Sequence, residues 1–318
     1  MAGSLTSVAT WDKATQRRRY AAHVASLPWD FQHAPLIVAA VTPLTADGDG
    51  LDVDAVWPMW SFLSDHGADG VFACGTTGEG ILLSLDERRE MAVAFRAAVR
   101  GRLIVHAGAQ STRDTVELAA HAAEVGADGV AVIPPPYFPL DEGALAAHFL
   151  AAAAACAPLP FFIYAFAARS GYPVTVGVVE RVAAAANNLA GLKVSESPLS
   201  KVEPYLDLGL PVLIGSEPLL PPAMARGAVG SVSGLAAAFP DAVREALDRP
   251  DADAEGRLGA LRSAMEAQPF IAAAKHVLAR RGVPISPGMR APMRPLFAEE
   301  ARALDAALDG MSVLSVAS

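Results

Sequence analysis

The run Ala190-Gly191-Leu192-Lys193-Val194 is one of eight short apolar runs whose recurrence determines the predicted architecture. Near-continuous apolar strands of this kind are typical of a parallel sheet that is covered on both faces. The runs recur at intervals of roughly 25 to 35 residues along most of the chain. They occupy residues 36–41, 70–74, 103–108, 129–133, 160–164, 190–194, 211–215 and 230–234.

Alanine-rich segments with helical periodicity separate these runs. Ser84 with Glu87, and Ser111 with Asp114, have the three-residue spacing of helix caps. Eight β-then-α units in about 215 residues match a closed (β/α)8 TIM barrel better than an open sheet. We therefore predict an N-terminal helix and linker over residues 1–34, the barrel over residues 35–240, and a C-terminal helical extension over residues 241–318.

Composition excludes several classes of protein. A net charge of -9 and a pI near 5.3 argue against a nucleic-acid surface, because phosphate binding needs clustered Lys and Arg. Cys74 and Cys156 lie in apolar segments without metal-ligand spacing, and no His, Asp or Glu cluster has such spacing either. We expect no metal, no cofactor and a reducing cytoplasm.

Residues 149–168 carry no formal charge and have the length of a membrane span. However, Pro158 and Pro160 divide an alanine-rich half from a β-like half, so we predict a helix, a turn and a strand. The chain does not open with the pattern of a signal peptide. The prediction is a cytoplasmic protein without a membrane partner.

Lys193 closes its apolar run and is one of four lysines in the chain. An amine held among apolar walls favours the neutral form, and a neutral amine can attack a ketone to form an imine. Lys193 could instead extend to the barrel rim or pair with Glu196, and taken alone it favours that alternative. The residues that follow the other runs reverse the preference.

Functional groups of a TIM barrel project from the carboxyl ends of its strands. Tyr164 ends the fifth run and Tyr137 follows the fourth. The loop Gly75-Thr76-Thr77-Gly78-Glu79 follows the second run, and its backbone N–H groups could form an anion nest, although a tight turn explains the glycines equally well.

Two further polar residues in these runs and loops are assigned to packing. We interpret Glu79 as a residue that braces the loop in preference to an acid or base. His106, which lies in the third run, is interpreted as a hydrogen-bonded packing residue in preference to a base.

These motifs, in this order and spacing, resemble the dihydrodipicolinate synthase and N-acetylneuraminate lyase family. The resemblance spans roughly residues 36–300. It rests on Gly-Thr-Thr-Gly-Glu at 75–79, Tyr164 with Arg-Ser-Gly at 169–171, and Gly-Leu-Lys ending at Lys193. Thr-Pro at 42–43, Gly-Ala-Asp at 126–128 and His-Phe at 148–149 add to it.

The resemblance implies a metal-independent class I aldolase, lyase or dehydratase that binds pyruvate or another 2-keto acid. Lys193 would form the imine and Tyr164 would shuttle protons. Gly75, Thr76 and Thr77 would hold the keto acid's carboxylate, with the Thr76 hydroxyl linking Tyr164 to Tyr137 of a neighbouring subunit. A homodimer or homotetramer is therefore expected.

The resemblance also implies that Arg169 binds a carboxylate of the second substrate. The segment after Tyr164 reads Ala-Phe-Ala-Ala, where the family commonly has asparagine and proline, so polarity beside the imine is reduced. The favoured reaction is condensation of pyruvate with aspartate semialdehyde. The alternatives are an aldolase or dehydratase for 2-keto-3-deoxy sugar acids, an N-acetylneuraminate lyase-like enzyme, and a barrel that binds keto acids without catalysis.

Overall fold

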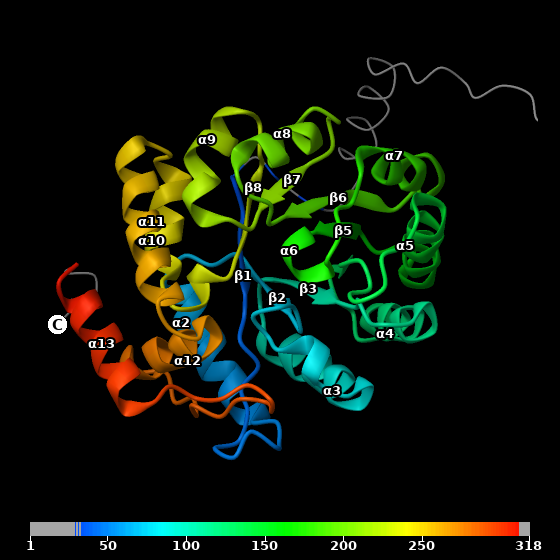
Figure 1. Ribbon diagram of the computed structural model, residues 1–318. Coiled ribbons are helices and arrows are strands. Elements are labelled where there is room, and N and C mark those ends of the chain that lie inside the picture. Colours follow the sequence, from blue (N-terminus) through cyan, green and yellow to red (C-terminus); the bar gives the residue numbers. More distant parts are fainter. Residues whose placement is uncertain (1–28, 30, 32, 312–318) are drawn as a thin grey trace, which may run out of the picture.

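A computed structural model describes residues 29, 31 and 33–311 of the 318-residue chain. The expected N-terminal helix falls largely on residues 1–28, outside the described residues. Eight parallel strands form a closed barrel in chain order, which confirms the predicted fold (Figure 1). The strands are β1 (Leu36–Ala39), β2 (Gly70–Ala73), β3 (Arg102–His106), β4 (Gly129–Val132), β5 (Phe161–Ala165), β6 (Leu189–Val194), β7 (Val212–Ile214) and β8 (Gly230–Ser233).

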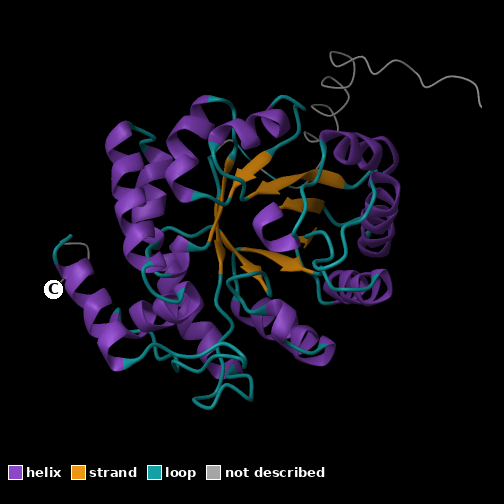
Figure 2. Ribbon diagram, in the orientation of Figure 1, coloured by secondary structure: helices purple, strands orange, loops and turns teal. Residues whose placement is uncertain are grey.

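Helices surround the barrel, and every strand is followed by helical structure (Figure 2). The α-helices up to the end of the barrel are α2 (Val56–Asp65), α3 (Leu85–Ala98), α4 (Thr112–Glu124), α5 (Glu142–Cys156), α6 (Ala167–Ser170), α7 (Val176–Ala185), α8 (Leu199–Leu206), α9 (Leu220–Ala225) and α10 (Pro240–Asp248). Short 3-10 helices occupy η1 (Val53–Ala55), η2 (Gly80–Leu82), η3 (Glu217–Leu219) and η4 (Leu235–Ala237).

The predicted start signals are present at two of these helices. Ser84 caps α3, and its capping box with Glu87 is complete. Ser111 caps α4 by accepting a hydrogen bond from the Asp114 backbone N–H. Residues 149–168 form the end of α5, a turn, β5 and the start of α6, so the predicted helix, turn and strand are present. No helix of the described part is long and apolar enough to cross a membrane.

Helix α10 packs against β1 and β8, and three further helices follow it. They are α11 (Ala252–Glu266), α12 (Phe270–Arg280) and α13 (Ala298–Asp309). In Figure 1 these helices lie together beside α10 and α2, and the segment between α12 and α13 runs below the barrel in this view. The expected C-terminal helical extension is therefore present.

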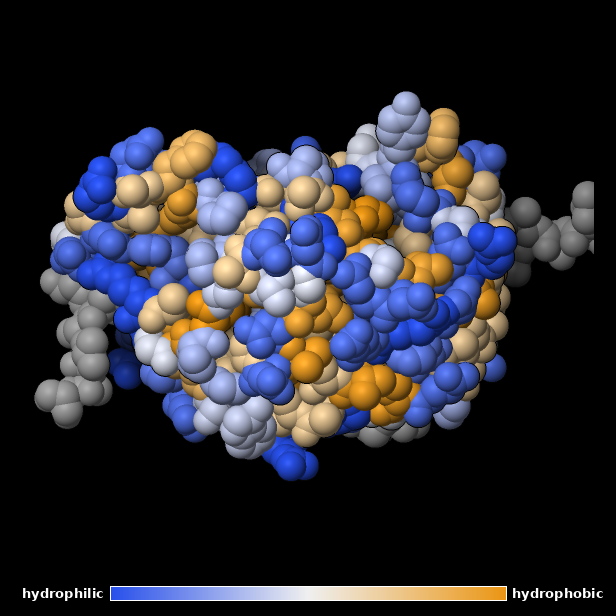
Figure 3. All heavy atoms as spheres, turned by 90° about the horizontal axis from the view of Figure 1, so that it is seen from below, coloured by the Kyte–Doolittle hydropathy of each residue, from blue (hydrophilic) through white to orange (hydrophobic). Residues whose placement is uncertain are grey.

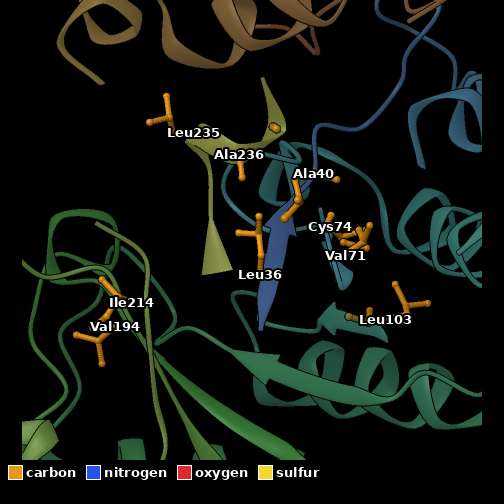
Figure 4. Close-up of a cluster of buried hydrophobic side chains, with 14 of the residues drawn as sticks. Leu36, Ala40, Val71, Cys74, Leu103, Val194, Ile214, Leu235 and Ala236 are labelled. Atoms are coloured by element: carbon orange, nitrogen blue, oxygen red, sulfur yellow. The ribbon is translucent and has the colours of Figure 1, made fainter. Parts of the chain in front are cut away.

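The hydrophobic core has two layers, because successive side chains of a strand point to opposite faces. The outer layer fills the space between strands and helices, and Figure 4 draws part of it around Leu36, Val71 and Ile214. The inner layer fills the barrel with Phe72, Phe162 and nine other buried side chains.

Trp29 belongs to this inner layer, and its indole N–H donates to the Asp128 carbonyl at 3.0 Å. Since Asp128 directly precedes β4, Trp29 packs at the amino ends of the strands. The Trp29 side chain therefore fills the amino end of the barrel.

A bulge in β6 decides which of its residues face inward. Phe161 pairs with Leu189, but Phe162 pairs with Gly191, so β6 carries one extra residue. Tyr164 consequently lies opposite Lys193. Without the extra residue, Leu192 would occupy that place, since a one-residue slip moves every side chain to the other face.

The outer surface carries an apolar groove between η1, α2 and α3. Val53, Trp57 and Val93 line it, and the Trp57 side chain is about half exposed. Figure 3, seen from below Figure 1, shows hydrophobic residues in patches among hydrophilic ones on this side of the molecule. The groove is built from helices and lacks the strand ends that carry Lys193.

Candidate active site

Lys193 lies inside the barrel in an apolar setting. Its residue is 4% exposed, and its Nζ lies 3.9 Å from the ring centroid of Phe72 and 4.1 Å from that of Tyr164. Burial penalises the ammonium and lowers the pKa of Lys193 from 10.5 to about 7, although the charge of Glu217 opposes the shift. A substantial fraction of this amine is therefore neutral, and nucleophilic, near pH 7.

Tyr164 joins Lys193 to the loop after β2. Its hydroxyl lies 3.4 Å from the Thr76 hydroxyl, and either atom could be the donor. Burial raises the pKa of Tyr164, while hydrogen bonds with Thr76 and Ser195 oppose the rise. The phenol is thus protonated at neutral pH, and the Thr76 hydroxyl offers it a path for proton exchange.

The Gly75–Glu79 loop turns sharply because Cys74 and Glu79, at its two ends, both have φ of 56°. A side chain at position 75 would clash with Phe72, since a Cβ there would lie 2.5 Å from the ring. The hydrogen bonds among the described residues leave the backbone N–H groups of Thr76 and Thr77 unused. These two groups are available to an anion.

Glu79 is a bracing residue, as the sequence analysis favoured. Its Oε1 accepts a hydrogen bond from Lys275 Nζ at 2.7 Å, and both side chains are completely buried. Its Oε2 accepts from the Arg290 backbone N–H at 2.8 Å. Since Lys275 lies on α12 and Arg290 follows it, Glu79 ties the loop after β2 to the C-terminal helical extension.

A cavity of about 310 Å³ opens above this loop. Thr76 lines it, so the cavity reaches the residue that is hydrogen-bonded to Tyr164. Polar side chains on its wall are those of Thr76, Glu79, His106 and Arg169. The larger part of the wall is hydrocarbon and thioether, from Ile81, Leu82, Ile133, Pro134, Pro136, Ile271 and Met293.

Arg169 is on α6, the short helix after β5, and its guanidinium carbon lies 5.6 Å from the ring centroid of Phe166. Among the residues that the structure describes, no carboxylate forms an ion pair with Arg169. The sequence prediction that it reaches the substrate site is consistent with its place on the cavity wall.

Tyr137 is not brought to this site by its own chain. It is 82% exposed and packs against Phe138, with ring centroids 4.8 Å apart, whereas the neighbouring Pro136 lines the cavity. The predicted relay from Thr76 to Tyr137 therefore stays a prediction that concerns a pair of chains.

His106 lines the cavity but is held as a packing residue, as expected. Its Nδ1 lies 3.1 Å from the Cys74 carbonyl oxygen, and its Nε2 accepts from the Ile133 backbone N–H at 3.4 Å. Burial, and then the charges of Arg88 and Lys193, lower the pKa of His106 well below its ordinary value. The imidazole is consequently neutral.

Two polar residues of the site were missed by the sequence analysis. Glu217 is completely buried after β7, where it accepts hydrogen bonds from the Ser233 hydroxyl at 2.7 Å and from Arg262 at 2.9 Å. Ser195 lies two residues after Lys193, near enough to Tyr164 to lower the pKa of its phenol. Their positions just beyond the seventh and sixth apolar runs were the available signal. No group of three or more metal-ligating side chains occurs within the described residues.

Comparison with known proteins gives consistent matches. The model of the dihydrodipicolinate synthetase family matches residues 32–311. An uncharacterized DapA-like lyase of Halobacterium salinarum is 35% identical over 290 residues, covering 88% of this chain and 94% of its own. The 4-hydroxy-tetrahydrodipicolinate synthase 1 of Streptomyces coelicolor is 34% identical over 282 residues, covering 85% and 92%.

A solved structure agrees with these relatives. YagE, an E. coli K12 prophage protein of the dihydrodipicolinic acid synthase family in complex with pyruvate, has a TM-score of 0.82 and 26% identity. The similarity covers 88% of this chain and 99% of YagE.

Proposed function

This chain belongs to the dihydrodipicolinate synthetase family, and on that premise we propose that it is a lysine-imine carbon–carbon lyase or synthase for pyruvate or a related 2-keto acid. The observation that carries the proposal is the buried amine of Lys193, whose pKa is about 7, beside the phenol of Tyr164. Catalytic amines of this kind need a neutral form at working pH and an acid–base partner within reach.

In the proposed mechanism, Lys193 Nζ adds to the keto carbon and water leaves as the imine forms. The imine withdraws electrons, so a proton can leave the methyl group and an enamine results. Tyr164 passes protons to and from these groups through the Thr76 hydroxyl, 3.4 Å away. Because the protonated imine is the electron sink, the reaction as proposed needs neither a metal nor an organic cofactor.

The loop after β2 would hold the carboxylate of the keto acid. The unused N–H groups of Thr76 and Thr77 supply hydrogen-bond donors that require no charge. Gly75 allows the loop to approach this closely, because a side chain there would clash with Phe72. These contacts would fix the orientation of the keto acid so that its keto carbon faces Lys193.

From the sequence, aspartate semialdehyde is expected as the second substrate of a synthase, and 2-keto-3-deoxy sugar acids as the substrates of an alternative aldolase or dehydratase. Aspartate semialdehyde is supported by Arg169, which could bind its carboxylate from the cavity wall. Its ammonium, however, would need an acceptor, and Glu79 is the one carboxylate among the described wall residues and is bound by Lys275. Sugar acids are supported by the similarity to N-acetylneuraminate lyases, but the same wall offers few hydrogen-bond partners for their hydroxyl groups.

We propose that the enzyme is an oligomer in which Tyr137 of a second copy completes the relay. The observation in favour is the exposure of Tyr137 and Phe138, at 82% and 70%, on the loop that also contributes Pro136 to the cavity. Large aromatic side chains this exposed are characteristic of interfaces.

The test is borohydride reduction in the presence of pyruvate, followed by peptide mass analysis. We expect a pyruvate-derived adduct on Lys193 that disappears in Lys193→Ala and persists in Lys201→Ala, since Lys201 is exposed on α8. An adduct without turnover of any aldehyde would identify a keto-acid-binding barrel instead. The absence of an adduct on Lys193 in the unaltered chain would refute the proposal.

A further inference from the structure

The wall of the cavity discriminates among second substrates. Seven of the thirteen residues that line it present hydrocarbon or thioether side chains, and two are glycines. Three different parts of the chain supply the apolar side: η2 after β2, the segment after β4, and the C-terminal helical extension through Ile271 and Met293. The apolar character is therefore shared by all three parts of the wall that this chain supplies.

Most polar side chains on the wall are already hydrogen-bonded within the protein, so few remain to bind a ligand. Glu79 is bound to Lys275 and to the Arg290 backbone, and His106 is bound to the Cys74 carbonyl and the Ile133 N–H. The Gly108 carbonyl accepts from Arg88 at 2.9 Å. Among the polar side chains of the described wall residues, only those of Thr76 and Arg169 are left to bind a ligand, and Thr76 is assigned to the keto acid.

A polyhydroxylated acceptor would consequently lose its hydrogen bonds to water without replacement. Each hydroxyl buried in this way disfavours binding. An ammonium group would be excluded more strongly, since Arg169 is the charge that faces it.

We infer that the acceptor is an aldehyde with an apolar body, aromatic or branched, and without hydroxyl or ammonium groups. The inference rests on the proposed imine chemistry and names the class of its second substrate. A dry cavity of about 150 Å³ can hold a benzene molecule. The volume here, about 310 Å³, admits such a ring together with the keto acid. Arg169 also admits an acidic substituent on the ring.

The reaction balances with these two substrates alone. The enamine carbon of the Lys193 adduct attacks the aldehyde carbon, so one carbon–carbon bond forms. The aldehyde oxygen takes up a proton, which replaces the one lost from the methyl group. Water, released when the imine formed, adds back and frees a 4-hydroxy-2-keto acid from Lys193. The reverse sequence cleaves that product to pyruvate and the aldehyde.

The experiment measures kcat/KM for condensation of pyruvate with benzaldehyde, 4-carboxybenzaldehyde, glyceraldehyde and aspartate semialdehyde, with product detected by mass spectrometry. We expect kcat/KM for benzaldehyde and for 4-carboxybenzaldehyde to exceed kcat/KM for glyceraldehyde and aspartate semialdehyde by about tenfold or more. Equal rates, or a preference for glyceraldehyde or aspartate semialdehyde, would overturn the inference.

Intrinsic reactivity differs among aldehydes, so a matched pair of variants is needed. Ile271→Asn places an amide on the wall from α12, and Ile271→Val removes one methylene group without a change of polarity. The benzaldehyde to glyceraldehyde ratio should fall about tenfold or more in Ile271→Asn and less than about threefold in Ile271→Val. Equal changes in the two variants would contradict an effect of polarity.

Failure of the two proposals can be told apart. The Lys193 adduct with pyruvate alone is measured in the same samples. An adduct combined with a preference for hydroxylated aldehydes overturns only the acceptor class. The absence of an adduct overturns the imine chemistry and the acceptor class with it.

Discussion

The pH dependence of Lys193 reactivity follows directly from its burial. A lysine with the ordinary pKa of 10.5 is neutral in only about 3 of 10⁴ molecules at pH 7. With the pKa of Lys193 lowered to about 7, about half of the molecules carry a neutral amine. Position within the barrel thus raises the concentration of the nucleophile about 10³-fold at pH 7.

The assay is trapping of the pyruvate imine by cyanoborohydride between pH 5.5 and 9, with peptide mass analysis of early time points. The rate at Lys193 is corrected at each pH for the rate at which cyanoborohydride reduces a preformed imine, which removes the pH dependence of the reductant. Below about pH 7 the amine must lose a proton before it attacks. The Lys193 rate should therefore rise about tenfold per pH unit and level off above pH 7.

A Lys193 rate that keeps rising to pH 9 would refute the argument, because it would mean an amine with an ordinary pKa. Glu217→Gln gives an independent check of the sign. The charge of Glu217 raises the pKa of Lys193, so its removal should move the levelling point to lower pH. A shift to higher pH would contradict the assigned electrostatics.

Three further predictions concern stability and turnover. Lys193→Met should stabilise the fold by up to about 4 kcal/mol at pH 7, because the pKa of Lys193 is lower in the folded than in the unfolded chain, so burial of the ammonium destabilises the fold. In unfolding titrations this gain should shrink toward about pH 10, where the amine is neutral in the folded chain and increasingly neutral in the unfolded one. Lys275→Met should cost about 3 to 5 kcal/mol in urea unfolding, since it leaves Glu79 buried and unpaired, and adding Glu79→Gln should recover part of the loss. Tyr164→Phe should slow turnover about 10²-fold or more, while the pyruvate adduct on Lys193 still forms in the mass assay.

The eight strands could be predicted from sequence because each is buried on both faces. A strand of that kind is a continuous apolar run, and every run lies within two residues of the strand it predicted. The same continuity hides which side chains point inward. The extra residue in β6 is therefore the feature that composition could not reveal, although Gly191 within the run was a possible sign of it.

The site was predictable to the extent that it sits at strand ends. Lys193, Tyr164 and Thr76 are adjacent because parallel strands end on one rim, and Arg169 lies on the cavity wall nearby. Contacts that depend on distant segments could not be predicted. Glu79 and Lys275 are 196 residues apart, and no local pattern specifies that they meet.

The wall of the cavity is partly supplied by residues beyond the eighth strand, whereas Lys193 is part of the sheet itself. Ile271 and Met293 can therefore vary without altering a single inter-strand hydrogen bond. Residues of the sheet and residues of the C-terminal helical extension thus make different parts of the site, and the contact between Lys275 and Glu79 links the two. Substitutions at Ile271 and Met293 that keep Lys275 should therefore change the cavity wall while Lys193 stays in place.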